Sequence, residues 1–228
     1  MISDFKQIET LFKEIDQYLK TKVRIYVIGG VVLLYQKLKP ATKDIDLVII
    51  KKEEFIAFEQ ALKNAHFESK IPTGIYMKMN LDQILIRDDF RIDAFFKTVC
   101  RHFVLSDGMQ KRAQKILVLP HLDVYLCSNE DIFVFKSFTE REGDLQDCIS
   151  LAEKGLDWNN VIHELQTQIQ HSGEDVWITW IGERLDLLVD KGLNIPVMDQ
   201  IDKLRDTYFK EIERKFSDKK KNKEKKQK

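Results

Sequence analysis

Three aspartates in the first hundred residues have a spacing that suits chemistry at phosphorus. Asp44 and Asp46 flank one isoleucine within the apolar run DIDLVII. Successive side chains of a strand alternate between its faces, so both carboxylates should leave the same face. They repel each other there unless protons or cations neutralise them. Mg²⁺ is the expected cation, because it takes oxygen ligands and shares them with phosphates.

A third carboxylate lies inside the apolar segment RIDAFF. If this strand pairs beside DIDLVII, Asp93 joins Asp44 and Asp46 at one point. Three such carboxylates can hold two metal ions for an in-line displacement at phosphorus. Taken alone, an Asp-x-Asp pair indicates a surface strand edge or a turn more often than a metal site. The third aspartate shifts the balance towards the metal site.

Two adjacent glycines precede this pair in the sequence. Gly29 and Gly30 separate the apolar run VRIYVI from VVLLYQKL, a strand and a short helix by their patterns. Backbone amides in such a turn can approach an anion closely, so a phosphate chain could lie there. The alternative is an ordinary tight turn.

The elements that must position these residues follow from hydrophobic periodicity. The N-terminal half mixes helical and alternating patterns. Helices are expected at 4–20, 31–38 and 53–65, and strands at 23–30, 44–50, 75–79, 83–86, 91–96, 115–119 and 123–127.

After residue 128 the pattern becomes helical throughout. Ser128 with Asp131 is typical of a helix start. The expected helices are 129–140, a second one ending at 154, 158–170, 174–190 and 197–216. The sequence thus predicts an α+β fold, with a small mixed sheet flanked by helices in residues 1–127, a helical bundle in 128–216 and a disordered basic tail in 217–228.

Composition limits the cellular setting. Hydrophobic residues are 43% and charged residues 32%, and no apolar run approaches the roughly 20 residues that cross a bilayer, so no membrane partner is expected. Three scattered cysteines without a CxxC spacing predict reduced thiols and a cytoplasmic protein. Net charge is zero, but the last 14 residues hold eight lysines against two acids, so the rest of the chain is acidic. Such a tail either solubilises the chain or touches RNA.

The order of motifs resembles the nucleotidyltransferase superfamily, whose catalytic domain is shared with polymerase β. The matching features are the glycine turn, the Asp44-x-Asp46 pair and the later Asp93, within residues 23–96. The resemblance implies transfer of NMP from an NTP with two Mg²⁺ ions held by these aspartates. One departure is Gly30, where many members have a serine whose hydroxyl touches phosphate.

The helical half is similar to abortive-infection and minimal nucleotidyltransferase toxins and related uncharacterised proteins. The segment EDIFVFKSFTEREGDLQDCISL holds a lysine followed by an Arg-x-x-Asp-x-x-Asp pattern. By this resemblance Lys136 contacts the triphosphate, although it could also snorkel from an apolar face. Arg141 contacts phosphate or pairs with a neighbouring acid. Asp144 is equally suited to cap the next helix, and Asp147 to orient Lys136 or Arg141.

The leading hypothesis is a Mg²⁺-dependent nucleotidyltransferase that uses an NTP and releases pyrophosphate. The acceptor hydroxyl could belong to an RNA 3′ end such as tRNA, to a protein or to a small molecule. The resemblance adds a toxin role with an antitoxin partner. The alternative is a non-catalytic nucleotide-binding or regulatory protein that retains the fold. The three tryptophans have helical spacings and favour packing over base stacking.

Overall fold

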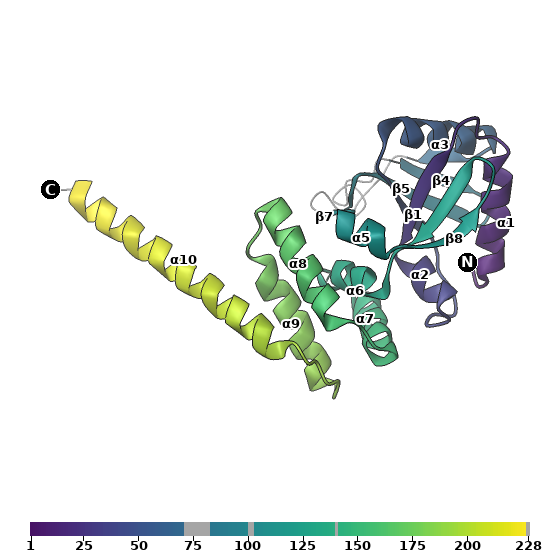
Figure 1. Ribbon diagram of the computed structural model, residues 1–228. Helices are drawn as coiled ribbons and strands as arrows, with labels where there is room; N and C mark the ends of the chain where they lie inside the picture. The colour runs from purple at the N-terminus through teal and green to yellow at the C-terminus, as the bar shows by residue number, and fades with distance from the viewer. Residues whose placement is uncertain (71–82, 100–102, 140, 227–228) are drawn as a thin grey trace.

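The computed structural model describes residues 1–70, 83–99, 103–139 and 141–226. A mixed sheet with flanking helices forms the first half of the chain, and helices alone follow it (Figure 1). The predicted α+β class is confirmed. The strand expected at 75–79 lies outside the described residues.

A seven-stranded mixed sheet organises the first half. Its order is β3-β4-β5-β2-β1-β9-β8, with the β5–β2 and β1–β9 pairs parallel and the remaining pairs antiparallel. The strands are β1 (Val23–Ile28), β2 (Ile45–Ile49), β3 (Glu68–Lys70), β4 (Gln83–Arg87), β5 (Phe90–Phe96), β8 (Gln114–Val118) and β9 (Leu122–Leu126). The central strand β2 therefore lies directly between the glycine-ended β1 and the Asp93 strand β5.

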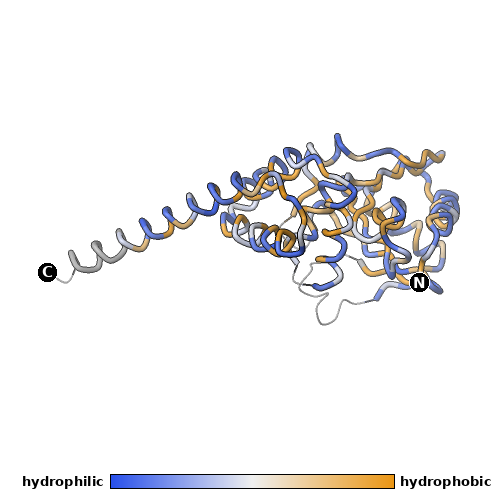
Figure 2. The backbone as a smooth tube through the Cα atoms, turned by 90° about the horizontal axis from the view of Figure 1, so that it is seen from below, coloured by the Kyte–Doolittle hydropathy of each residue, from blue (hydrophilic) through white to orange (hydrophobic). Residues whose placement is uncertain are grey.

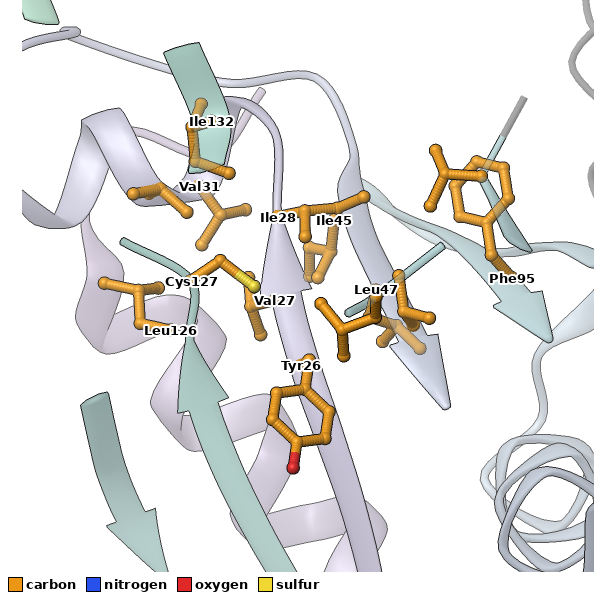
Figure 3. Close-up of a cluster of buried hydrophobic side chains, with 14 of the residues drawn as sticks. Tyr26, Val27, Ile28, Val31, Ile45, Leu47, Phe95, Leu126, Cys127 and Ile132 are labelled. Atoms are coloured by element: carbon orange, nitrogen blue, oxygen red, sulfur yellow. The ribbon is translucent and has the colours of Figure 1, made fainter. Parts of the chain in front are cut away.

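Three helices pack around the central strands. Helices α2 (Gly30–Tyr35) and α3 (Lys52–Asn64) contact β1 and β2, and α1 (Phe5–Asp16) packs on both helices. Asp4 begins α1 with a complete capping box, which fixes where this helix starts. The apolar residues of β1, β2 and β9 fill the space between these layers (Figure 3). Ile45 and Leu47 are fully buried there, so strand alternation turns Asp46 to the opposite face.

Five helices build the second half of the chain. They are α6 (Asn129–Ser137), α7 (Glu142–Lys154), α8 (Trp158–Ser172), α9 (Trp177–Asp190) and α10 (Met198–Lys226). Helix α6 packs against α7, α8 and α9, and it begins at the predicted Ser128 cap, whose hydroxyl accepts from the Asp131 amide. None of the helices in the described residues could span a membrane.

Helix α10 leaves the body of the protein as a long arm (Figures 1 and 2). The expected disordered tail from residue 217 differs from the structure, in which the helix continues to Lys226. Lysine, glutamate and glutamine have high helix propensity, and no glycine or proline interrupts the segment, so the backbone of α10 simply extends.

Sequence periodicity missed a small insertion between β5 and β8. It holds the short hairpin β6 (Thr98–Val99) and β7 (Phe103–Val104) and the helix α5 (Asp107–Arg112). Two-residue strands give too few positions for an alternating pattern. A buried network ties the insertion to the helical half, because Arg112 forms ion pairs with Asp131 on α6 and Glu164 on α8.

Candidate active site

The turn between β1 and α2 requires glycines because polar side chains lie directly against it. Gly29 has φ +68°, and a Cβ at this position would lie 2.2 Å from the Oδ2 atom of Asp46. A Cβ on Gly30 would lie 2.5 Å from the Thr42 hydroxyl oxygen. The turn thus has no room for side chains, since the Asp46 carboxylate and the Thr42 hydroxyl occupy that space. This hydroxyl in turn donates to the backbone carbonyl of Asp44, at 3.2 Å.

The three predicted carboxylates come together at the centre of the sheet. Strands β2 and β5 are parallel with Asp46 directly opposite Asp93, and Asp44 immediately precedes β2. Burial raises the pKa of Asp46 well above its usual value, and the charges of Asp44 and Asp93 raise it further. Burial also raises the pKa of Asp93, although Arg91 works against this shift. The charge of Asp44 thus makes both Asp46 and Asp93 harder to ionise, and the charge of Asp93 does the same to Asp46.

Arg91 is a site residue whose role the sequence reasoning missed. Its Nε donates to Oδ1 of Asp93 at 2.7 Å, and its second guanidinium nitrogen donates to Oδ2 at 2.6 Å. Both residues lie on β5 two positions apart, so they share a face. The Arg-x-Asp spacing in an apolar strand was the signal that could have found this pair.

Lys136 is held between two carboxylates rather than at the surface. Only 8% of the residue is exposed, and its Nζ lies 2.6 Å from Asp144 and 2.7 Å from Asp147. Burial opposes the charged form, but these two aspartates outweigh it and raise the pKa of Lys136. Asp147 also accepts from Lys39 Nζ at 2.9 Å. The snorkelling alternative is therefore wrong, and Asp147 does orient Lys136.

The capping role considered for Asp144 is also wrong. Helix α7 begins at Glu142 with Arg141 as its N-cap, so Asp144 lies inside the first turn. Its carboxylate turns inward and accepts from Lys136, from the Thr139 hydroxyl and from Arg141 Nε, each at 2.6 Å. Sequence position suggested a cap because Gly143 precedes it, but the helix starts one residue earlier than that glycine.

Arg141 connects this network to the sheet carboxylates. Its side chain is largely exposed, and Asp46 and Asp44 contribute to its raised pKa after Asp144. Lys136 and Arg141 in turn lower the pKa of Asp46 against the larger effect of burial. The structure thus brings the aspartates, the glycine turn and both predicted cations into one neighbourhood.

This geometry agrees with the comparison to known protein families. Residues 4–179 match the family described as a nucleotidyltransferase of unknown function (DUF6036). The chain belongs to this nucleotidyltransferase family. No curated protein matches it. Among solved structures, a crystal structure of ANT(2″)-Ia in complex with adenylyl-2″-tobramycin is similar, with 11% identity and a TM-score of 0.46 over 72% of this chain and 98% of that one.

The three carboxylates of this nucleotidyltransferase differ in how open they are to a cation. In the described ranges no three acidic, histidine or cysteine side chains already form a ready metal cage. Both oxygens of Asp93 accept from Arg91, whereas the Asp44 and Asp46 carboxylates make no hydrogen bond or ion pair within those ranges. Two open oxygen donors beside a glycine turn suit a hard cation such as Mg²⁺, and Asp93 would add a third donor only if Arg91 gave up one of its oxygens.

Proposed function

We propose that this nucleotidyltransferase transfers NMP from an NTP to an acceptor hydroxyl and releases pyrophosphate. The observation that carries the proposal is the register of β2 and β5, which sets Asp46 opposite Asp93 beside Asp44 and Gly29. Such a cluster of repelling carboxylates destabilises the fold unless cations bind it. A site of this kind is therefore better explained by ligand binding than by stability.

Each residue has a distinct part in the proposed reaction. Asp44 and Asp46, with Asp93, would hold Mg²⁺, which when bound neutralises phosphate charge and polarises the α-phosphorus. The amides of Gly29 and Gly30 would line the phosphate chain. The acceptor oxygen would form a bond to the α-phosphorus while the bond to the bridging oxygen of the β-phosphate breaks. Asp93, whose pKa is raised, would take the proton of the acceptor hydroxyl.

The cationic network supplies the charge that a triphosphate requires. The ion pairs of this network join three cations, Lys39, Lys136 and Arg141, to two carboxylates, Asp144 and Asp147. The network therefore carries one net positive charge. Lys136 is fixed by its two partners, so its charge is preorganised rather than mobile. Arg141 is exposed and can reach a bound nucleotide.

The decisive experiment follows label from each α-labelled NTP with Mg²⁺, with and without total RNA and cell extract. We expect label on RNA, on protein or on a small molecule, and no label with Asp44→Asn or Asp46→Asn. Arg141→Gln should mainly raise the KM for NTP, because the cation touches substrate and not the reacting atoms. Full activity of Asp46→Asn would sink the mechanism.

Two finer parts of the proposal rest on sequence resemblance. A cytoplasmic toxin with an antitoxin partner, and tRNA or a protein as acceptor, are supported by the Arg141-x-x-Asp144-x-x-Asp147 segment. The non-catalytic alternative is favoured by one observation, namely that Arg91 occupies both oxygens of Asp93. NTP binding without transfer to any acceptor would support that alternative.

A further inference from the structure

A pocket of 580 Å³ lies beside the Lys136 network, where the end of α6 and the start of α7 meet α9. It is lined, among others, by Phe138, Arg141, Leu145, Trp180, Arg184 and Leu187. Two features of this pocket point to a ligand: a buried cation and an exposed ring.

Arg184 is the buried cation. Only 7% of it is exposed, and its guanidinium donates to the backbone carbonyl of Thr139. Within the described part of the chain it forms no ion pair, and Glu142 and Glu183, which also line the pocket, are exposed. Arg112 shows the contrast, since it is paired with two carboxylates. A buried guanidinium without a counter-ion is costly, so Arg184 is suited to receive an anion from the pocket.

Trp180 is the exposed ring. It remains 46% exposed although Trp177, one turn earlier, is buried at 3%. Trp180, Arg184 and Leu187 are spaced four and three residues apart on α9, so they form one stripe along the pocket. An exposed indole face beside an anion receptor suits a flat ring that bears a phosphate. The packing role predicted for the three tryptophans therefore holds for Trp158 and Trp177, whereas Trp180 leaves nearly half of its surface exposed.

The position of the pocket indicates which substrate it serves. Arg141 lines the pocket and donates to Asp144, which also accepts from Lys136. The pocket therefore borders the cationic network that joins the helical half to the sheet half. The triphosphate would place its anionic groups at the glycine turn and Lys136. Arg184 is a separate anion receptor, and the base of the same NTP brings no further anion to it.

We propose that this pocket is an acceptor subsite for a nucleotide unit, with its ring on Trp180 and its phosphate on Arg184. The inference rests on the proposed function and deepens it, because it assigns the acceptor a chemical class. The nucleotide unit could be a free mononucleotide or the end of an RNA strand, and these sources can be separated experimentally.

Calorimetric titration without metal tests the subsite independently of catalysis. The probes are AMP, adenosine and a tetraribonucleotide with a free 3′ hydroxyl. We expect adenosine to bind at least tenfold more weakly than AMP, because it lacks the phosphate that the Arg184 guanidinium would hold by a charge-assisted hydrogen bond. Tighter binding of the tetraribonucleotide identifies an RNA end, and tighter binding of AMP a mononucleotide.

Substitutions of pocket residues test whether AMP and adenosine bind in this pocket. Arg184→Gln keeps a donor for the Thr139 carbonyl and should lose about tenfold in AMP affinity without affecting adenosine. Trp180→Leu should weaken both probes. Lys203→Gln and Phe209→Leu, which remove an exposed charge and an exposed ring of α10, should change nothing.

The outcomes separate this inference from the proposed function. Equal binding of AMP and adenosine, unchanged affinity in Arg184→Gln, or no binding of any probe to folded wild-type protein would overturn the subsite. If those tests succeed but no NTP label is ever transferred, the proposed function fails while the nucleotide pocket stands. If label is transferred and Arg184→Gln has an unchanged KM for the acceptor, the function stands and the subsite fails.

Discussion

Replacing Asp46 by asparagine should stabilise the metal-free protein while it removes activity. The Asp46 carboxylate makes no hydrogen bond in the described residues, and its neighbours Asp44 and Asp93 repel it. Adjacent strands lie about 4.8 Å apart, so the two facing carboxylates are taken as about 5 Å apart. At an effective dielectric constant near 20 their repulsion is about 3 kcal/mol.

Nearby cations reduce that figure. Arg91 neutralises part of the Asp93 charge, and Lys136 and Arg141 attract Asp46. A net gain of about 1–2 kcal/mol is expected for Asp46→Asn, which corresponds to a rise in Tm of about 2–8 °C for a chain of this size. The matched control is Asp206→Asn, which makes the same chemical change at an exposed position of α10 and should leave Tm unchanged.

The stabilisation expected for Asp46→Asn depends on pH, because it requires an ionised Asp46 in the wild type. The pKa of Asp46 is raised above its ordinary value of 3.8, so the folded state binds the proton more tightly than the unfolded state. The destabilisation is therefore absent below the ordinary value and develops as pH rises through the raised pKa. The Tm difference between variant and wild type should be close to zero at low pH and largest once the pH exceeds the raised pKa of Asp46.

Thermal unfolding in EDTA across this pH range, monitored by circular dichroism, provides the measurement. Added Mg²⁺ should raise the Tm of the wild type and not that of Asp46→Asn, because only the native charged site binds it. An Asp46→Asn protein that is no more stable than Asp206→Asn at every pH would show that the carboxylates do not repel one another as argued here.

Three further perturbations are predicted. Gly29→Ala should lower the free energy of unfolding in urea by at least about 1 kcal/mol and abolish transfer, because Gly29 has a positive φ and the Asp46 carboxylate lies 2.2 Å from the new Cβ. The control Gly143→Ala has open space around it and should be neutral or stabilising in the same urea titration. Asp147→Asn should cost about 3–5 kcal/mol in urea unfolding, because two lysines lose a buried partner; a cost below 1 kcal/mol would contradict this. Arg91→Gln should raise the pKa of Asp93, so the acid limb of the pH–rate profile should move to higher pH, and an unmoved limb would show that Asp93 does not ionise during turnover.

Strand alternation made the grouping of the three aspartates predictable. Asp46 and Asp93 interrupt apolar strands, and a third aspartate near an Asp-x-Asp pair favoured a shared site over a surface strand edge or a turn. The two glycines at a strand end predicted a turn that a phosphate chain could approach, with an ordinary tight turn as the alternative. In the structure the carboxylate of Asp46 occupies the space beside Gly29, and the phosphate contact stays a prediction.

Features that depend on packing between distant segments were not predictable in this way. The contact between Lys39 and Asp147 joins residues 108 positions apart, and no local pattern encodes it. Arg184 and Trp180 looked like ordinary members of an amphipathic helix, because their meaning comes from the pocket that α6 and α7 form against α9. The length of α10 was misjudged because high charge was weighed above helix propensity.

The ion pairs of Asp147 restrict how this architecture can be recombined. Lys39 follows the short helix of the sheet half, whereas Asp147 and Lys136 belong to the helical half. A chimera joined near residue 128 would take the residue at position 39 from one parent and Asp147 from the other. The buried carboxylate would then lack one of its two lysine partners unless both parents had a lysine there. Grafting a different helical half onto this sheet would therefore require that Lys39 be exchanged along with it.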